Sequence, residues 1–130
     1  MQLIPTFWPA IVISPNGPAV VHASDSSLVT TANPAKAGEL LSLYATGLGP
    51  TIPGVDPGQP FPASPPSVVS SPVTVTVNGT DAEVLYAGGY PGSVDGYQVN
   101  FRLPATTTGP SLIQVSAAWI NGTAVNIPVR

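Results

Sequence analysis

The sequence predicts an all-β fold of two packed sheets, and three observations support this. Segments in which apolar and polar residues alternate recur along the 130 residues, and 13 glycines and 17 prolines punctuate them. Alternation is the pattern of a strand with one buried face, whereas Gly and Pro mark turns. We count about seven to nine short strands of this kind, which is typical of a two-sheet sandwich.

The first third of the chain contains three predicted strands. Residues 10–13 and 19–23 are short apolar runs, and the Pro-Asn-Gly-Pro sequence of residues 15–18 separates them as a turn. Residues 39–45 are mainly apolar, with Glu39 and Ser42 as exceptions. Gly38 precedes them and a Gly-Leu-Gly-Pro sequence follows, which leaves too little length for a helix, so we expect a strand.

A Pro-rich loop is predicted at residues 50–72, which hold eight prolines. Each proline fixes φ and removes a backbone donor, so the segment should lie as an extended strap over the surface. Loops of this length inside a compact domain are uncommon.

Two hairpins and a central strand are predicted in the second half. Residues 73–77 alternate Val and Thr, and Asn78-Gly79 is a tight-turn pair that leads into a return strand at residues 82–87. A second Asn-Gly turn at residues 121–122 separates strands at 111–120 and 124–129. In the strand between the hairpins, the inward side chains are Tyr97, Val99, Phe101 and Leu103, and the outward ones are Gln98, Asn100 and Arg102.

The composition excludes several classes of function. Only 7% of the residues are charged, against roughly 25% in an ordinary soluble domain, and six acids against three bases provide no basic patch for nucleic acid. There is no cysteine, which excludes disulfides and thiol nucleophiles, and a single histidine excludes a multi-histidine metal site. That residue, His22, is expected to be a surface or hydrogen-bonded strand residue, and the pair Asp81 and Glu83 to face solvent. We therefore expect no enzymatic activity and no cofactor.

Location is predicted from composition. No apolar run approaches the ~20 residues that span a bilayer, so no transmembrane segment is expected. The charge-poor, Ser-, Thr-, Gly-, Pro- and Val-rich sequence favours a secreted or cell-surface protein.

Three stretches form a set that is similar to a known family. They are ANPAKAGE at residues 32–39 running into ATGLGP at 45–50, VTVNG at 75–79 leading to AEVLYAG at 82–88, and GYQVNFRLP at 96–104. Together they resemble the C-terminal domain of many large secreted acidobacterial proteins, a family without an assigned activity, and more distantly the immunoglobulin-like IPT/TIG domains. Over residues 10–130 the resemblance implies an immunoglobulin-like sandwich, secretion and a structural or adhesive role.

The N-terminal residues suggest self-association. No residue up to Val21 is charged, and we divide the chain into an apolar segment at 1–14 and a sandwich domain at 15–130. Two interpretations stay open: the segment adds a strand to a neighbouring subunit and so builds a filament or surface array, or residues 10–14 are the first strand of their own sandwich. The candidate association residues are Leu3, Ile4, Phe7, Trp8, Ile11, Val12 and Ile13.

Carbohydrate binding is the alternative function. An accessory module of a larger secreted protein would present exposed aromatic rings to a polysaccharide. Tyr90, in a Gly- and Pro-rich loop, and Trp119, beside a turn, are the candidates. The expected partners are thus protein, either other copies of the chain or neighbouring domains, or polysaccharide.

Overall fold

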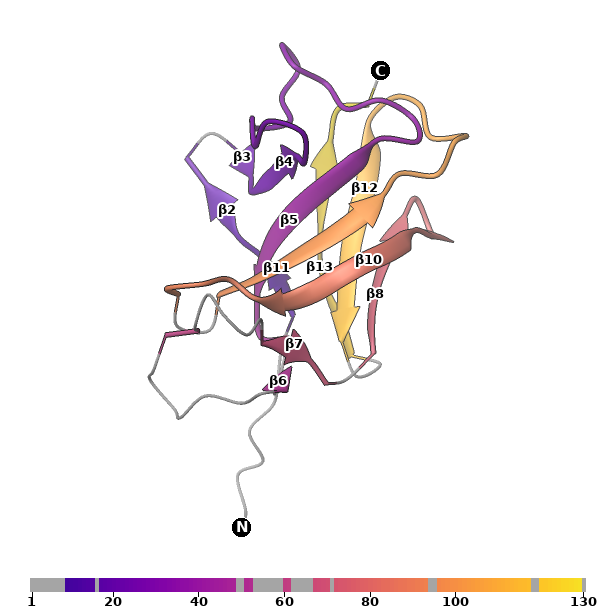
Figure 1. Cartoon of the computed structure of the whole chain (residues 1–130). Helices are drawn as coiled ribbons and strands as arrows, with labels where there is room; N and C mark the ends of the chain where they lie inside the picture. The colour runs from indigo at the N-terminus through magenta and orange to yellow at the C-terminus, as the bar shows by residue number, and fades with distance from the viewer. Residues whose placement is uncertain are drawn as a thin grey trace.

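The computed structural model describes residues 9–15, 17–48, 51–52, 60–61, 67–70, 72–93, 96–117 and 120–129 (Figure 1). These residues form thirteen strands and no helix, and none of the described segments is a helix that could cross a membrane. The strands are β1 (Ala10–Ile11), β2 (Ile13–Ser14), β3 (Gly17–Pro18), β4 (Val20–His22), β5 (Leu40–Thr46), β6 (Thr51–Ile52), β7 (Val68–Val69), β8 (Val73–Val77), β9 (Thr80–Asp81), β10 (Glu83–Gly89), β11 (Gly96–Arg102), β12 (Ser111–Ala117) and β13 (Ile120–Ile127).

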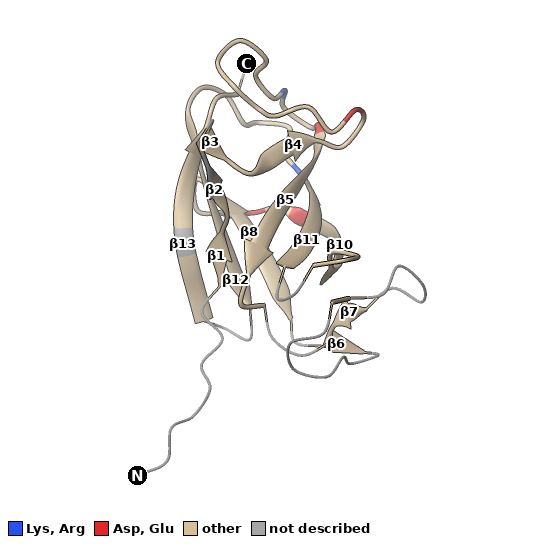
Figure 2. Ribbon diagram, turned by 90° about the vertical axis from the view of Figure 1, so that its left-hand side faces the viewer, with Lys and Arg blue, Asp and Glu red and all other residues tan. Residues whose placement is uncertain are grey.

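Two antiparallel sheets pack into a sandwich (Figure 1 and Figure 2). The larger sheet has the order β1-β5-β11-β10-β7-β6, with β4 also paired to β5, and the smaller has the order β13-β12-β8-β9. If β1 and β4 count as strand A, β5, β8, β10, β11, β12 and β13 take the places of B to G. The sheets are then ABED and CFG, the arrangement of an immunoglobulin constant-type domain. The predicted immunoglobulin-like β-sandwich is confirmed.

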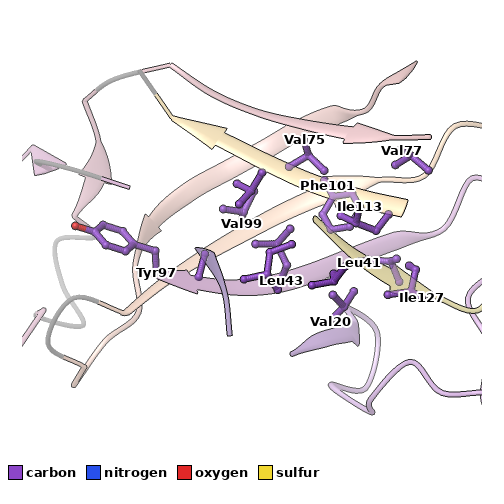
Figure 3. Close-up of a cluster of buried hydrophobic side chains, with 14 of the residues drawn as sticks. Val20, Leu41, Leu43, Val75, Val77, Tyr97, Val99, Phe101, Ile113 and Ile127 are labelled. Atoms are coloured by element: carbon purple, nitrogen blue, oxygen red, sulfur yellow. The ribbon is translucent and has the colours of Figure 1, made fainter. Parts of the chain in front are cut away.

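The core fills the space between the sheets (Figure 3). Leu41 and Leu43 of β5 and Val99 and Phe101 of β11 face it from the larger sheet, and all four are fully buried. From the smaller sheet come Val75 and Val77 of β8, Ile113 and Val115 of β12, and Ile127 of β13. The inward and outward sides predicted for residues 97–103 are as observed.

The first predicted hairpin is shorter than expected. Asn78 and Gly79 do form the tight turn, with φ of 53° and 83°. However, only β9 pairs with β8, at Thr76↔Asp81 and Val77↔Thr80. The following residues cross to the other sheet, where β10 pairs with β11. The alternation that identifies a strand does not say which sheet it joins, so the expected return strand at 82–87 was wrong in its partner.

The prediction of a second Asn-Gly turn at residues 121–122 was wrong. Asn121 and Gly122 lie inside β13, and the register pairs Ala117 with Ile120, so residues 118–119 separate the two strands. Between the pairs Gln114↔Ala124 and Ser116↔Asn121, β13 has one residue more than β12. This is a β-bulge, in which a glycine is favoured for the same lack of a Cβ that suits it to turns.

The described residues of the Pro-rich loop extend the larger sheet. β6 and β7 pair with each other, and Val68 of β7 pairs with Gly88 of β10. Phe61 is buried, and its backbone N–H donates to Ser93 O at 2.9 Å while its carbonyl accepts from Gly92 N at 2.8 Å. Phe61 thus attaches the loop to the end of the sandwich.

Candidate functional site

The described residues of the N-terminal segment belong to their own sandwich. Ala10 and Ile11 pair with Thr46 and Ala45 of β5, and Ile11, only 3% exposed, packs in the core. Val12 and Ile13 face outward, Ile13 with 63% of its surface exposed. Leu3, Ile4, Phe7 and Trp8 lie outside the described residues. Of the seven candidate association residues, Ile11 is therefore occupied within the chain, whereas Val12 and Ile13 are accessible.

A groove lined mostly by apolar residues lies between the two sheets, where β10 and β8 face each other, and polar atoms make up about half of its exposed surface. A depression of about 300 Å³ is lined by side chains of β7, β8 and β10, which are Val68, Val69, Val73, Val84, Leu85, Tyr86 and Ala87. β7 pairs with β10 only at Gly88, so residues 83–87 of β10 form an edge without a described neighbour on that side. Leu85, at a register shift between Val84 and Tyr86, is 50% exposed.

Charges are concentrated toward one end of the molecule (Figure 2). The described acidic and basic residues lie in the loops beside β4, on β9, at the start of β10 and at the end of β11, whereas β6, β7 and β1 carry none. Charged side chains normally protect sheet edges and surfaces against pairing with other chains. The end that bears β6 and β7 lacks this protection in its described part.

Tyr90 is exposed as the sequence predicted, with 44% of its surface accessible. Its ring contacts Tyr44 edge-on at a centroid distance of 5.3 Å. Both border a shallow, mainly apolar depression of about 310 Å³ together with Val12, Ala45, Ser93, Gly96 and Tyr97. Burial, and secondly the neighbouring Tyr90, raise the pKa of Tyr44 above its usual value. Trp119 lies outside the described residues, so the expected pairing of Tyr90 with Trp119 stays a prediction.

A polar site surrounds His22, whose relative exposure to solvent is only 7%. Its Nδ1 contacts a carboxylate oxygen of Glu39, and its Nε2 lies 3.0 Å from the carbonyl oxygen of Asn33. The second Glu39 oxygen accepts from Lys36 N at 2.9 Å. Asp25 Oδ1 accepts from the Ser27 hydroxyl at 2.7 Å and from its backbone N–H at 3.0 Å, and these bonds lower the pKa of Asp25.

Sequence reasoning identified His22 as a hydrogen-bonded strand residue but missed its partner. Glu39 precedes β5, and β5 pairs with β4 so that His22 lies opposite Leu41. A polar residue at the first position of the predicted strand 39–45 is a weak signal, because the pairing of that strand is needed to bring it beside His22. Asp81 and Glu83 are exposed as expected, and Glu83 lies 3.5 Å from Arg102.

Comparison with family models, with curated proteins and with solved structures finds no match to this chain.

Proposed function

We propose that this chain is a non-catalytic extracellular module that associates with other copies of itself. In this proposal, residues 3–8 of one copy add to the free edge of β10 in the next copy, and repetition of the contact builds a filament or surface array. The observation that carries the proposal is the groove at the free edge of β10, which is lined mostly by apolar residues and includes the half-exposed Leu85.

The length and chemistry of the two surfaces support this pairing. Residues 3–8 read Leu-Ile-Pro-Thr-Phe-Trp and carry no charge. A six-residue extended segment spans about 20 Å, and the five-residue edge at 83–87 about 17 Å. Added strands gain affinity from backbone hydrogen bonds and specificity from pockets that take alternate side chains. The pairing of β1 with β5 would hold residues 3–8 to their own subunit while they add to the next one.

The energy required sets a lower limit on the contact. Association loses on the order of 4–15 kcal/mol in translational and rotational freedom. A fully buried large apolar side chain contributes roughly 1.5–3 kcal/mol. Several of Leu3, Ile4, Phe7 and Trp8 must therefore be buried together in the groove, and a contact by one of them alone would not hold two copies.

Secretion and a structural role are supported by the low content of charge and by the resemblance to domains of large secreted proteins. The absence of cysteine and the single histidine in the full sequence disfavour nucleophilic and metal chemistry. The chain is accordingly proposed as a structural partner without a cofactor.

The experiment compares the full chain with a chain that begins at Pro9, by size-exclusion chromatography with light scattering and by negative-stain microscopy. This cut keeps β1 and the buried Ile11, whereas a cut at Pro15 would remove part of the core. We expect oligomers or filaments from the full chain and folded monomers from the shortened one.

A matched pair of substitutions tests the receiving surface. Leu85→Lys places a charge at the groove, and Leu112→Lys places one on the outer face of β12, where the leucine has a comparable exposure of 44%. Leu85→Lys should abolish the oligomers and Leu112→Lys should not. Monomers from the full chain at millimolar concentration would refute the proposal, as would oligomers that survive both the truncation and Leu85→Lys.

A further inference from the structure

The outer face of the larger sheet carries two rows of polar and aromatic side chains. The register places Tyr44 of β5, Gln98 of β11 and Gly88 of β10 opposite one another in one row. Two residues along, Ser42, Asn100 and Tyr86 form the next row. By alternation with the core residues at 41, 43, 97, 99 and 101, all six positions point away from the core, although Ser42 and Gly88 are themselves buried.

The three polar side chains of these rows hold one another in place. Asn100 Oδ1 accepts from the Ser42 hydroxyl at 2.7 Å and from Gln98 Nε2 at 3.0 Å. These two bonds use the acceptor capacity of the Asn100 carbonyl oxygen. The Asn100 amino group, Gln98 Oε1 and the second N–H of Gln98 make no hydrogen bond within the described part of the chain. Gln98 and Asn100 are partly exposed, so these donors and acceptors remain accessible between the strands, whereas Ser42 is buried.

Tyrosine rings flank this polar strip on both sides. Tyr44 of β5 lies opposite Gln98 of β11, and its ring contacts the ring of Tyr90. Tyr86 reaches over Gly88: a Cβ built on this glycine would lie 2.2 Å from Tyr86 Oη, so the ring can occupy this position only because residue 88 has no side chain. Neighbouring strands are about 4.8 Å apart and the two tyrosines are offset by two residues along the strands, so Tyr44 and Tyr86 arise about 12 Å apart across β11.

We infer that this face binds an uncharged polysaccharide, with Gln98 and Asn100 bonding to sugar hydroxyls between the Tyr44 and Tyr86 rings. A hydroxyl donates one hydrogen bond and accepts others, which matches the mixed donor and acceptor set left by the two amides. Tyrosine rings offer apolar faces to the C–H surfaces of sugar rings. The charged residues of these strands, Glu83 and Arg102, lie at one end of the face 3.5 Å from each other, so neither leaves an unbalanced charge for an anionic ligand.

This site differs from the groove of the proposed self-association and shares only Tyr86 with it. It shares Tyr44 with the depression at Tyr90 but differs from it in polarity, because Ser93 is the one non-aromatic polar side chain there and its hydroxyl donates to Gly96 O. An apolar depression of that kind suits a side chain better than a sugar, whereas the oriented amides suit a sugar.

Affinity electrophoresis of the full chain tests the inference, in gels that contain xylan, hydroxyethylcellulose or mixed-linkage β-glucan. We expect retardation by at least one of these neutral polymers, and at least a tenfold loss of affinity in Gln98→Ala and in Tyr44→Ala. Thr74→Ala, exposed on the smaller sheet, is the matched control and should bind normally. Thermal unfolding of each variant checks that it is folded.

A second readout uses the unmodified chain, in case a variant does not fold. Addition of a soluble oligosaccharide of the retarding polymer should shift the side-chain amide NMR signals of Gln98 and Asn100, and leave that of Asn126 on β13 unchanged. No retardation by any of the three polymers would overturn the inference. Retardation that survives both Gln98→Ala and Tyr44→Ala would overturn it as well.

Discussion

The carbonyl oxygen of Pro9 lies against the Cα of Gly122: a Cβ built on Gly122 would lie 2.3 Å from it and 2.7 Å from Val115 O. Pro9 is fully buried and directly precedes β1, so this contact fixes the point at which the N-terminal segment enters the sandwich. Both obstructing atoms belong to the backbone and have little room to move. The lack of a side chain at Gly122 is therefore what allows the chain entering β1 to pass close to β13.

Gly122→Ala should loosen β1. The methyl group must displace Pro9 or the strand that carries Val115, and an overpacked site of this kind typically destabilises by about 1–3 kcal/mol. We expect a lower midpoint of denaturant unfolding and faster hydrogen exchange of the amide of Val12, which donates to Tyr44 O. Unchanged exchange at Val12 would contradict the assigned role of Gly122.

The two Asn-Gly pairs should respond differently to the same change. Gly79 needs a left-handed backbone, with φ of 83° and open space around its Cα, and Asn tolerates this conformation. Gly122 is obstructed by backbone atoms instead. Gly79→Asn should therefore cost well under 1 kcal/mol of unfolding free energy, whereas Gly122→Asn should be at least as destabilising as Gly122→Ala. Equal losses in the two variants, measured by urea denaturation, would refute this distinction.

The sequence predicts the strands of this fold better than their pairing. Alternation at residues 97–103 depends on local periodicity alone, and the burial of Val99 and Phe101 agrees with it. The identical Asn-Gly pairs, by contrast, are a turn in one place and a bulge in the other. The difference depends on Pro9, which lies more than a hundred residues away in the chain and could not be placed beside Gly122 from local pattern.

The candidate sites were harder to predict for the same reason. Tyr90 was recognised as exposed because it lies in a Gly- and Pro-rich loop, which is a local signal. The network of Ser42, Gln98 and Asn100 joins β5 to β11, and its existence depends on the register Asn100↔Ser42. Alternation predicts that Gln98 and Asn100 point outward. That they lie between Tyr44 and Tyr86 follows only from the order of β5, β11 and β10 in the sheet.

Gly89→Ala should detach the Pro-rich loop at its anchor. A Cβ on Gly89 would lie 2.3 Å from Cγ of Phe61, whose ring also packs against Tyr97 at a centroid distance of 5.3 Å. Because Phe61 is buried between these neighbours, its ring must leave its site to admit the methyl group. We expect a loss of about 1–3 kcal/mol of stability and faster hydrogen exchange at the amides of Phe61 and Gly92.

A control separates this effect from general destabilisation. Gly92 has φ of 85° and no atom near its Cβ position, so Gly92→Ala strains the backbone of the same region without touching the ring. Exchange at Phe61 that rises equally in both variants would show that the ring contact with Gly89 is not what holds the loop.

The contacts of the His22 ring require a proton at both ring nitrogens, one on Nε2 and one between Nδ1 and Glu39. The carbonyl oxygen of Asn33 can only accept, so Nε2 carries a hydrogen, and Nδ1 faces a carboxylate oxygen of Glu39. One proton must lie between Nδ1 and that oxygen, since a neutral imidazole lone pair would otherwise face a negative charge. Burial lowers the pKa of His22, but the hydrogen bonds to Glu39 and Asn33 and the charges of Glu39 and Asp25 outweigh it and raise that pKa above 6.5.

Stability should consequently fall as the pH rises through the folded-state pKa of His22. A group whose folded pKa is raised binds its proton more tightly in the folded chain, so its stabilisation is complete below pH 6.5 and is lost above the folded pKa. Because the chain has one histidine, its ring signals in an NMR titration need no assignment, and their midpoint should lie above 6.5.

Glu39→Gln should lower this midpoint, and His22→Gln should remove the pH dependence of unfolding between pH 6 and 8. Lys36, which lines a depression together with His22 and Glu39, provides the control: Lys36→Gln should leave the midpoint above 6.5, because Glu39 and Asn33 remain. A midpoint at or below 6.5 in the unaltered chain would contradict the shared proton.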